Sequence, residues 1–138
     1  MASKKFLFMV DKLPYKAESS RLALTHAIAS QTVDIHLDED DEMEEPVIAF
    51  VGDGVLNCMK GQKALECYGV TSLEMHIKNA LLTDIKVLIC KEDVERLGLS
   101  EDNLIMDAED IGADMQSEIV PFDDILQQME KSNHILYF

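Results

Sequence analysis

The sequence predicts an α/β fold, a three-layer sandwich in which a mostly parallel sheet of about five strands is flanked by helices. Segments typical of strands alternate along the chain with segments of helical periodicity, the order found in parallel sheets. Two internal runs, residues 46–52 and 85–90, are almost continuously apolar, as in strands covered on both faces. The chain has 138 residues, 47% of them apolar, which is enough for one domain with its own core. We therefore predict a single domain over residues 1–138.

The opening part of the chain predicts the first strand and the first helix. Residues 4–10 form a short apolar run that ends at Asp11, which is typical of a strand followed by a loop. Ser19 or Ser20 can cap a helix that continues to about residue 32. Its apolar stripe is expected to comprise Leu22, Ala23, Ala27, Ile28 and Ala29.

Residues 34–45 contain eight acidic side chains and no Lys or Arg. Because like charges repel one another, we expect an acidic, solvated loop here that contributes little to the core. The second strand follows at residues 46–52. Asp53 and Gly54 then turn the chain into a short helical turn at residues 55–60.

The second half of the chain is predicted to begin with a helix capped by Thr71 or Ser72. The apolar face of this helix comprises Leu73, Ile77, Ala80 and Leu81. The third strand, residues 85–90, precedes a short helix at residues 92–97 that stops at Gly98, the usual residue type at a helix C-terminus. The remaining elements are a brief strand, a helix that begins with proline, and a final strand, at residues 118–120, 121–131 and 134–138.

The net charge of −15 bears on the class of partner. Nucleic-acid binding depends largely on Lys and Arg, and this chain has 12 basic residues against 27 acidic ones. We therefore expect no nucleic acid as a partner. No apolar run approaches the roughly 20 residues that cross a bilayer, and charged residues follow the short apolar start at once. We expect no membrane contact and a cytoplasmic location.

The sequence lacks the common motifs for metals and cofactors. Its three cysteines and four histidines fall at irregular spacings, without a zinc pattern or a disulfide framework. The loop at residues 11–18 lacks the glycine-rich or hydroxyl-rich cradle that a nucleotide or flavin phosphate needs. We therefore expect no metal and no cofactor.

Cys90 is the candidate catalytic residue. It ends an apolar strand just before a predicted helix, where backbone N–H groups favour a thiolate. Reactive groups in a parallel sheet collect at the carboxyl ends of strands, so we expect Cys90 near the loops at residues 11–18 and 53–61. The alternative is a buried core cysteine, because free cysteine is among the most buried residue types. Cys58 and Cys67 are expected to pack, and Cys90 to alkylate fastest of the three.

The residues after Cys90 affect its charge. Lys91 adds a positive charge nearby, whereas Glu92, Asp93 and Glu95 oppose a thiolate. Helix-dipole effects at exposed sites are worth about 0.3–1 kcal/mol. We therefore expect the opposing influences on the pKa of Cys90 nearly to cancel.

Five short motifs lie along the chain in a particular order. They are the opening strand with Leu13, Pro14 and Tyr15, the segment 53–57, the segment 60–62, the strand-to-helix segment 88–99, and the terminal residues 135–138. In this order they resemble the DsrE/DsrF-like family, which includes the TusC and TusD sulfur-relay subunits. The resemblance extends over almost the whole chain. Gly61-Gln62 and the terminal Leu-Tyr-Phe are more similar to the DsrF/TusC branch than to the DsrE/TusD branch.

The resemblance implies a flavodoxin-like layering and assembly into trimers or hexamers, from identical or related chains. The sulfur-accepting cysteine of the family, carried chiefly by the DsrE/TusD branch, matches Cys90. The first implied function is a subunit of an intracellular sulfur-relay or sulfur-oxidation system, a sulfurtransferase-type carrier that accepts and passes sulfane sulfur as a Cys90 persulfide. The alternative is a non-catalytic structural subunit of a DsrEFH/TusBCD-like complex, which holds other sulfur-relay proteins in place.

Overall fold

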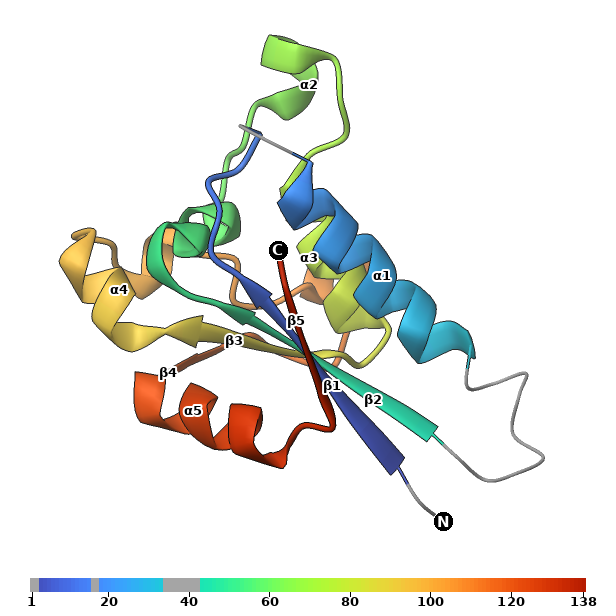
Figure 1. Cartoon of the computed structure of the whole chain (residues 1–138). Coiled ribbons are helices and arrows are strands. Elements are labelled where there is room, and N and C mark those ends of the chain that lie inside the picture. Colours follow the sequence, from blue (N-terminus) through green and yellow to red (C-terminus); the bar gives the residue numbers. More distant parts are fainter. Residues whose placement is uncertain (1–2, 16–17, 34–42) are drawn as a thin grey trace.

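The computed structural model describes residues 3–15, 18–33 and 43–138. Within these residues, five parallel strands form one sheet in the order β4-β3-β2-β1-β5 (Figure 1). The strands are β1 (Ser3–Val10), β2 (Met43–Phe50), β3 (Lys86–Cys90), β4 (Glu118–Val120) and β5 (His134–Tyr137). The predicted parallel sheet of about five strands is confirmed.

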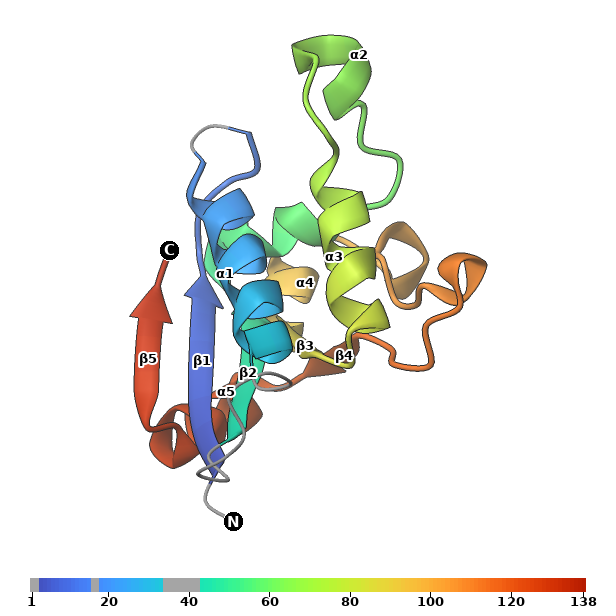
Figure 2. The ribbon, with the colours of Figure 1, turned by 90° about the vertical axis from the view of Figure 1, so that its right-hand side faces the viewer.

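Helices cover both faces of the sheet and complete three layers. The helices are α1 (Ser19–Val33), α2 (Ala64–Tyr68), α3 (Leu73–Leu82), α4 (Lys91–Arg96) and α5 (Phe122–Lys131), with short 3-10 helices η2 (Gly52–Cys58), η3 (Glu101–Asn103) and η4 (Glu109–Ile111). Helices α1 and α3 pack against each other on one face of the sheet (Figure 2). The chain runs from β1 to β4 in one direction and returns to β5 through α5. Because such crossovers are right-handed, α5 lies on the opposite face.

The central strands β2 and β3 are buried on both faces. Ile48, Ala49 and Phe50 of β2 are fully buried, and so are Val87 and Ile89 of β3. Consecutive side chains of a strand point to opposite faces, so a continuous buried run requires cover on both sides. Helices α1 and α3 provide one cover, and α5 contributes to the other.

Helix α1 begins where the sequence predicts but buries a different stripe. Ala23, Leu24 and Ala27 are fully buried, whereas Leu22 is 49% exposed and Ala29 is exposed as well. Each residue turns a helix by about 100°, so the three buried residues share a face that directs Leu22 away from the sheet. The predicted stripe is therefore wrong at Leu22 and Ala29.

Some of the residues predicted to cap helices do so in the structure, and others do not. Ser72 caps α3, because its Oγ accepts a hydrogen bond from the Glu74 N–H at 3.0 Å. Ser20 is buried and its Oγ has no partner among the described residues, so it does not cap α1. Gly98 follows α4 with φ of 70°, in the left-handed region that glycine adopts readily. The predicted stop at Gly98 is confirmed.

Strand β2 begins earlier than the sequence predicts. It starts at Met43, which pairs with Ser3 of β1. Pro46 lies just before Val47, the first residue of β2 that pairs with β3, so no ladder bond to β3 requires an N–H at Pro46. The acidic loop predicted at residues 34–45 therefore ends sooner, and the rest of it lies outside the described residues.

Helix α2 is absent from the sequence prediction. It lies at the tip of a segment that projects beyond the carboxyl ends of the strands (Figures 1 and 2). Leu65 and Tyr68 are 71% and 66% exposed, and Ala64 is the buried residue of the helix. Cys67 is exposed as well, so the expectation that it packs is wrong. A helix that buries so little has no apolar stripe to indicate it in the sequence.

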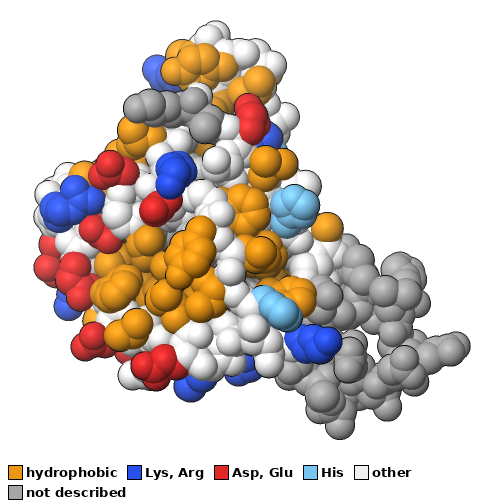
Figure 3. All heavy atoms as spheres, in the orientation of Figure 1, with side chains coloured by type: hydrophobic (Ala, Val, Ile, Leu, Met, Phe, Trp, Pro, Cys, Tyr) orange, Lys and Arg blue, Asp and Glu red, His pale blue; other side chains and the backbone are white. Residues whose placement is uncertain are grey.

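Strand β5 forms an edge of the sheet and part of an apolar surface. A groove of about 400 Å³ lies between β5 and α1. It is lined by Phe6, Phe8, His26, Ala29, Ser30, Leu136 and Phe138. Hydrophobic side chains gather in the middle of the face drawn in Figure 3, where β5 lies in Figure 1. Leu136 and Tyr137 are 42% and 67% exposed.

Candidate functional site

Three loops meet at the carboxyl ends of the strands, as the sequence predicts. The Asn57 Nδ2 donates a hydrogen bond to the Lys12 carbonyl oxygen at 2.8 Å, which joins the loop after β1 to η2. The Gly52 N–H donates to Asp93 Oδ2 at 2.7 Å, which joins η2 to α4. Cys90 is the last residue of β3 and immediately precedes α4. The prediction that these segments lie at the same edge of the sheet as Cys90 is confirmed.

Gly54 allows η2 to pass against the end of β1. A Cβ atom at this residue would lie 2.1 Å from the Val10 carbonyl oxygen and 2.9 Å from the Cα of Asp11. Both neighbours are backbone atoms, so only a residue without a side chain permits this approach. The Val51 N–H donates to the same Val10 oxygen at 3.0 Å, which holds the two segments together.

Tyr15 and Gln62 connect two further motif segments. The Tyr15 hydroxyl donates a hydrogen bond to Gln62 Oε1 and accepts one from the Leu73 N–H at 2.9 Å. Gln62 Nε2 donates to the carbonyl oxygens of Asn57 and Met59 at 2.8 and 2.9 Å. These contacts tie the first loop, η2 and the start of α3 to one another. We therefore assign Tyr15 and Gln62 a structural role at this edge.

Cys90 lies at the carboxyl end of β3, the edge at which ligands of open α/β sheets bind. The strand order reverses between β1 and β5, so this topological switch point lies two strands away from Cys90. The edge is closed at Cys90 itself, because this residue is only 2% exposed.

Burial raises the pKa of the Cys90 thiol to about 11. The Asp93 N–H at the start of α4 acts in the other direction, and the Asp93 and Glu92 carboxylates add to the rise. The N–H group that was predicted to favour the thiolate is therefore present, but it lowers the pKa of Cys90 by less than the loss of hydration raises it. The expectation that Cys90 alkylates fastest does not fit the burial of the three thiols, because Cys67 is exposed while Cys90 and Cys58 are buried.

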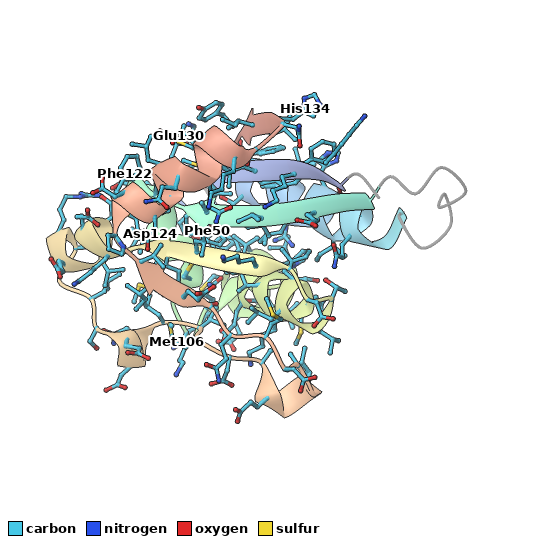
Figure 4. All side chains as sticks on the ribbon, turned by 90° about the horizontal axis from the view of Figure 1, so that it is seen from below. Phe50, Met106, Phe122, Asp124, Glu130 and His134 are labelled. Carbon is cyan, nitrogen blue, oxygen red and sulfur yellow. The ribbon has the colours of Figure 1, made fainter. Side chains whose placement is uncertain are left out.

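Two carboxylates tie α4 to its neighbours around Cys90. The Cys90 Sγ donates a weak hydrogen bond to Glu92 Oε1 at 3.9 Å, and the same oxygen accepts from the Phe122 N–H at 2.9 Å. Figure 4 shows Phe122 at the end of α5 that lies toward α4. Asp93, already bonded to η2, also accepts from Arg96 Nε at 3.2 Å. Helix α4 is thus held to η2 on one side and to α5 on the other.

Sequence reasoning missed these two connections. It treats Glu92 and Asp93 only as charges that oppose a thiolate. Acidic residues in the first turn of a helix are a signal for contacts with backbone N–H groups. The partners themselves are distant in sequence, since Phe122 is 30 residues from Glu92 and Gly52 is 41 residues from Asp93.

Cys58 and Cys67 differ from each other in burial. Cys58 is fully buried, and burial raises the pKa of its thiol well above the usual value. All three cysteines are free thiols. Within the described ranges, no group of three or more His, Cys, Asp or Glu side chains could hold a metal ion. No helix in the same ranges has the length and apolar character that a membrane crossing requires.

Residues 4–138 match the sequence profile of the DsrE/DsrF-like family. The chain belongs to this family. The fold of this DsrE/DsrF-like protein is similar to that of the ychN protein from E. coli, with 21% identity, a TM-score of 0.73 and coverage of 98% of this chain and 99% of that one. Protein MTH1491 from Methanobacterium thermoautotrophicum is 15% identical, with a TM-score of 0.56 and coverage of 96% and 98%. Protein BT1422 from Bacteroides thetaiotaomicron is 12% identical, with a TM-score of 0.55 and coverage of 96% and 94%.

No curated protein sequence matches the chain. The three similar structures are at most 21% identical to this chain, so they show only the fold, which they share over nearly the whole chain. Membership of the DsrE/DsrF-like family supports a role of the sulfur-relay type and suggests partner subunits in a complex.

Proposed function

We propose that this chain is a subunit of an intracellular sulfur-relay or sulfur-oxidation system that accepts and passes on sulfane sulfur as a Cys90 persulfide. The observation that carries the proposal is the position of Cys90 at the carboxyl end of β3, immediately before α4. Ligands and reactive groups of parallel sheets gather at this edge. Family membership supports the same kind of chemistry in general.

The proposed reaction moves one sulfur atom between thiols. The Cys90 thiol first loses its proton, and the thiolate attacks the outer sulfur of a donor persulfide. A new S–S bond forms at Sγ while the S–S bond of the donor breaks, and the donor leaves as a thiolate. The exchange is balanced without a further oxidant or reductant. Because burial raises the pKa of Cys90 to about 11, the site has to open before the thiolate forms.

A second function, that of a non-catalytic structural subunit, is favoured by the closure of the site. Cys90 is 2% exposed, and a thiol with a pKa of about 11 is protonated at neutral pH. On this alternative Cys90 is a core residue, and the chain contributes surfaces to a DsrEFH/TusBCD-like complex. Gly61-Gln62 and the terminal Leu-Tyr-Phe, which resemble the DsrF/TusC branch, favour the same alternative.

Both functions require partners, and we propose other sulfur-relay proteins or related subunits. The assembly that we propose is a trimer or hexamer, from identical or different chains. Support comes from the apolar surface around β5, where Leu136 and Tyr137 are 42% and 67% exposed. Apolar side chains that gather at a surface commonly mark a protein interface.

Mass spectrometry with site resolution distinguishes the two functions. The chain with Cys67→Ser, which removes the exposed thiol, is incubated with inorganic polysulfide. We expect Cys90 to gain the mass of one sulfur atom and a small thiol to remove it again. Cys90→Ser in the same background is the matched control and should gain nothing at residue 90. A folded chain whose Cys90 stays unmodified would favour the structural subunit instead.

A further inference from the structure

Glu92 occupies the space next to the Cys90 sulfur. Its Oε1 lies 3.9 Å from Sγ and 2.9 Å from the nitrogen of Phe122, so one oxygen joins the thiol to the start of α5. The second carboxylate oxygen lies 3.2 Å from the same nitrogen. The carboxylate is therefore oriented by α5, a different element from the helix that carries it.

An added sulfur on Cys90 would compete with Glu92 for this space. An S–S bond is about 2.05 Å long, so an outer sulfur pointing toward Glu92 would lie about 2 Å from Oε1, well inside contact distance. The remaining surroundings of Sγ are closed, because Cys90 is 2% exposed. We infer that Glu92 is a positioning residue that closes the sulfur site, and that it releases Phe122 before a sulfane sulfur reaches Cys90. This inference rests on the proposed carrier function of Cys90.

The elements around Cys90 carry further charges. They include Lys91, Glu92, Asp93, Glu95 and Arg96 of α4, Asp53 of η2, Glu118 of β4, and Asp123 and Asp124 in the first turn of α5. Asp93 is paired with Arg96, which also pairs with Asp53 at 3.3 Å. Glu92 differs from Asp93 because it holds α5 as well as the thiol. Removal of its side chain is therefore expected to expose the Cys90 sulfur.

The test compares Glu92→Ala with the matched control Glu95→Ala. Both variants remove one carboxylate from α4, but Glu92 is the one whose carboxylate contacts Cys90 and Phe122. The measured quantity is the alkylation rate of Cys90 relative to the exposed Cys67 in the same chain. We expect about a tenfold increase for Glu92→Ala, the size typical of losing a hydrogen bond to a charged group. Glu95→Ala should show no comparable increase, and equal rates for the two variants would overturn the inference.

Glu92→Gln provides a second measurement, because it keeps an oxygen acceptor for the Phe122 N–H and removes the charge. The Glu92 carboxylate raises the pKa of the Cys90 thiol, so alkylation of Cys90 should begin at lower pH in this variant. An unchanged pH profile together with an unchanged rate would argue for a structural contact only. The fully buried Cys58 reports global unfolding in every variant, since it is alkylated only when the core opens.

The alkylation experiment needs no sulfur donor, so it is separate from the test of the carrier function. If Glu92→Ala accelerates alkylation but Cys90 takes no sulfur from polysulfide, the closing role of Glu92 stands and the carrier function fails. If Cys90 takes up sulfur at the same rate in Glu92→Ala and Glu95→Ala, the carrier function stands and the inference about Glu92 fails.

Discussion

At the scale of single residues, backbone atoms leave no room for a side chain at Gly54. We expect Gly54→Ala to lower the free energy of unfolding by about 3 kcal/mol, the upper part of the usual range for overpacking. The reason is the 2.1 Å distance from the added Cβ to the Val10 carbonyl oxygen, which cannot move without shifting β1. Urea unfolding followed by circular dichroism measures the change.

Gly61→Ala is the control for this prediction. It makes the same chemical change at φ of 74°, where the added Cβ would meet no atom within 4 Å. Only the left-handed backbone conformation then resists the substitution, at a cost of about 1–2 kcal/mol. A Gly54→Ala variant as stable as Gly61→Ala would show that η2 can move away from β1.

The properties of Cys90 can be predicted only in part from the sequence. Its place at the end of an apolar strand is visible in the sequence and identifies it as the candidate. Its burial and the rise of its pKa to about 11 depend on side chains that fold around it. The sequence shows that the charged residues Glu92 and Asp93 follow Cys90, but it does not show that desolvation is the larger cause of the raised pKa.

At the scale of elements, the Tyr15 hydroxyl joins the loop after β1 to α3. Tyr15→Phe should lower the free energy of unfolding by about 1–2 kcal/mol, because it removes the donor to Gln62 Oε1 and the acceptor of the Leu73 N–H. Tyr137→Phe is the control, since Tyr137 is 67% exposed, and should change stability by no more than about 0.5 kcal/mol. Thermal unfolding of the two variants side by side gives the comparison, and equal melting temperatures would contradict the prediction.

Helix α1 could be predicted in part from the sequence, whereas helix α2 could not. The start of α1 is readable from Ser19 onward, but which residues face the sheet depends on how the helix is rotated against β2 and α3. Leu22 therefore points outward although its residue type favours burial. Helix α2 projects from the body and buries little, so no periodic pattern reveals it.

At the scale of the whole molecule, we expect the chain to form a trimer or hexamer in solution. Family membership suggests partner subunits, and the exposed apolar side chains of β5 provide a surface for them. Light scattering coupled to size exclusion at micromolar concentration measures the mass directly. A single monomeric peak would contradict a homo-oligomer, and copurification from the native host would then be needed to find a heteromeric partner.

The α/β class, the alternation of strands and helices, and the choice of Cys90 as the candidate residue could all be predicted from local patterns in the sequence. These features follow from local patterns, because a buried strand is continuously apolar and a packed helix repeats its apolar residues every turn. The tertiary structure was needed to show which face of α1 is buried, how far β2 extends along β1, and that Cys90 is buried next to Glu92. Each of these depends on contacts between residues far apart in the chain, such as the 30 positions between Glu92 and Phe122. Local patterns carry no record of such distant contacts, since packing and desolvation arise only when the segments meet.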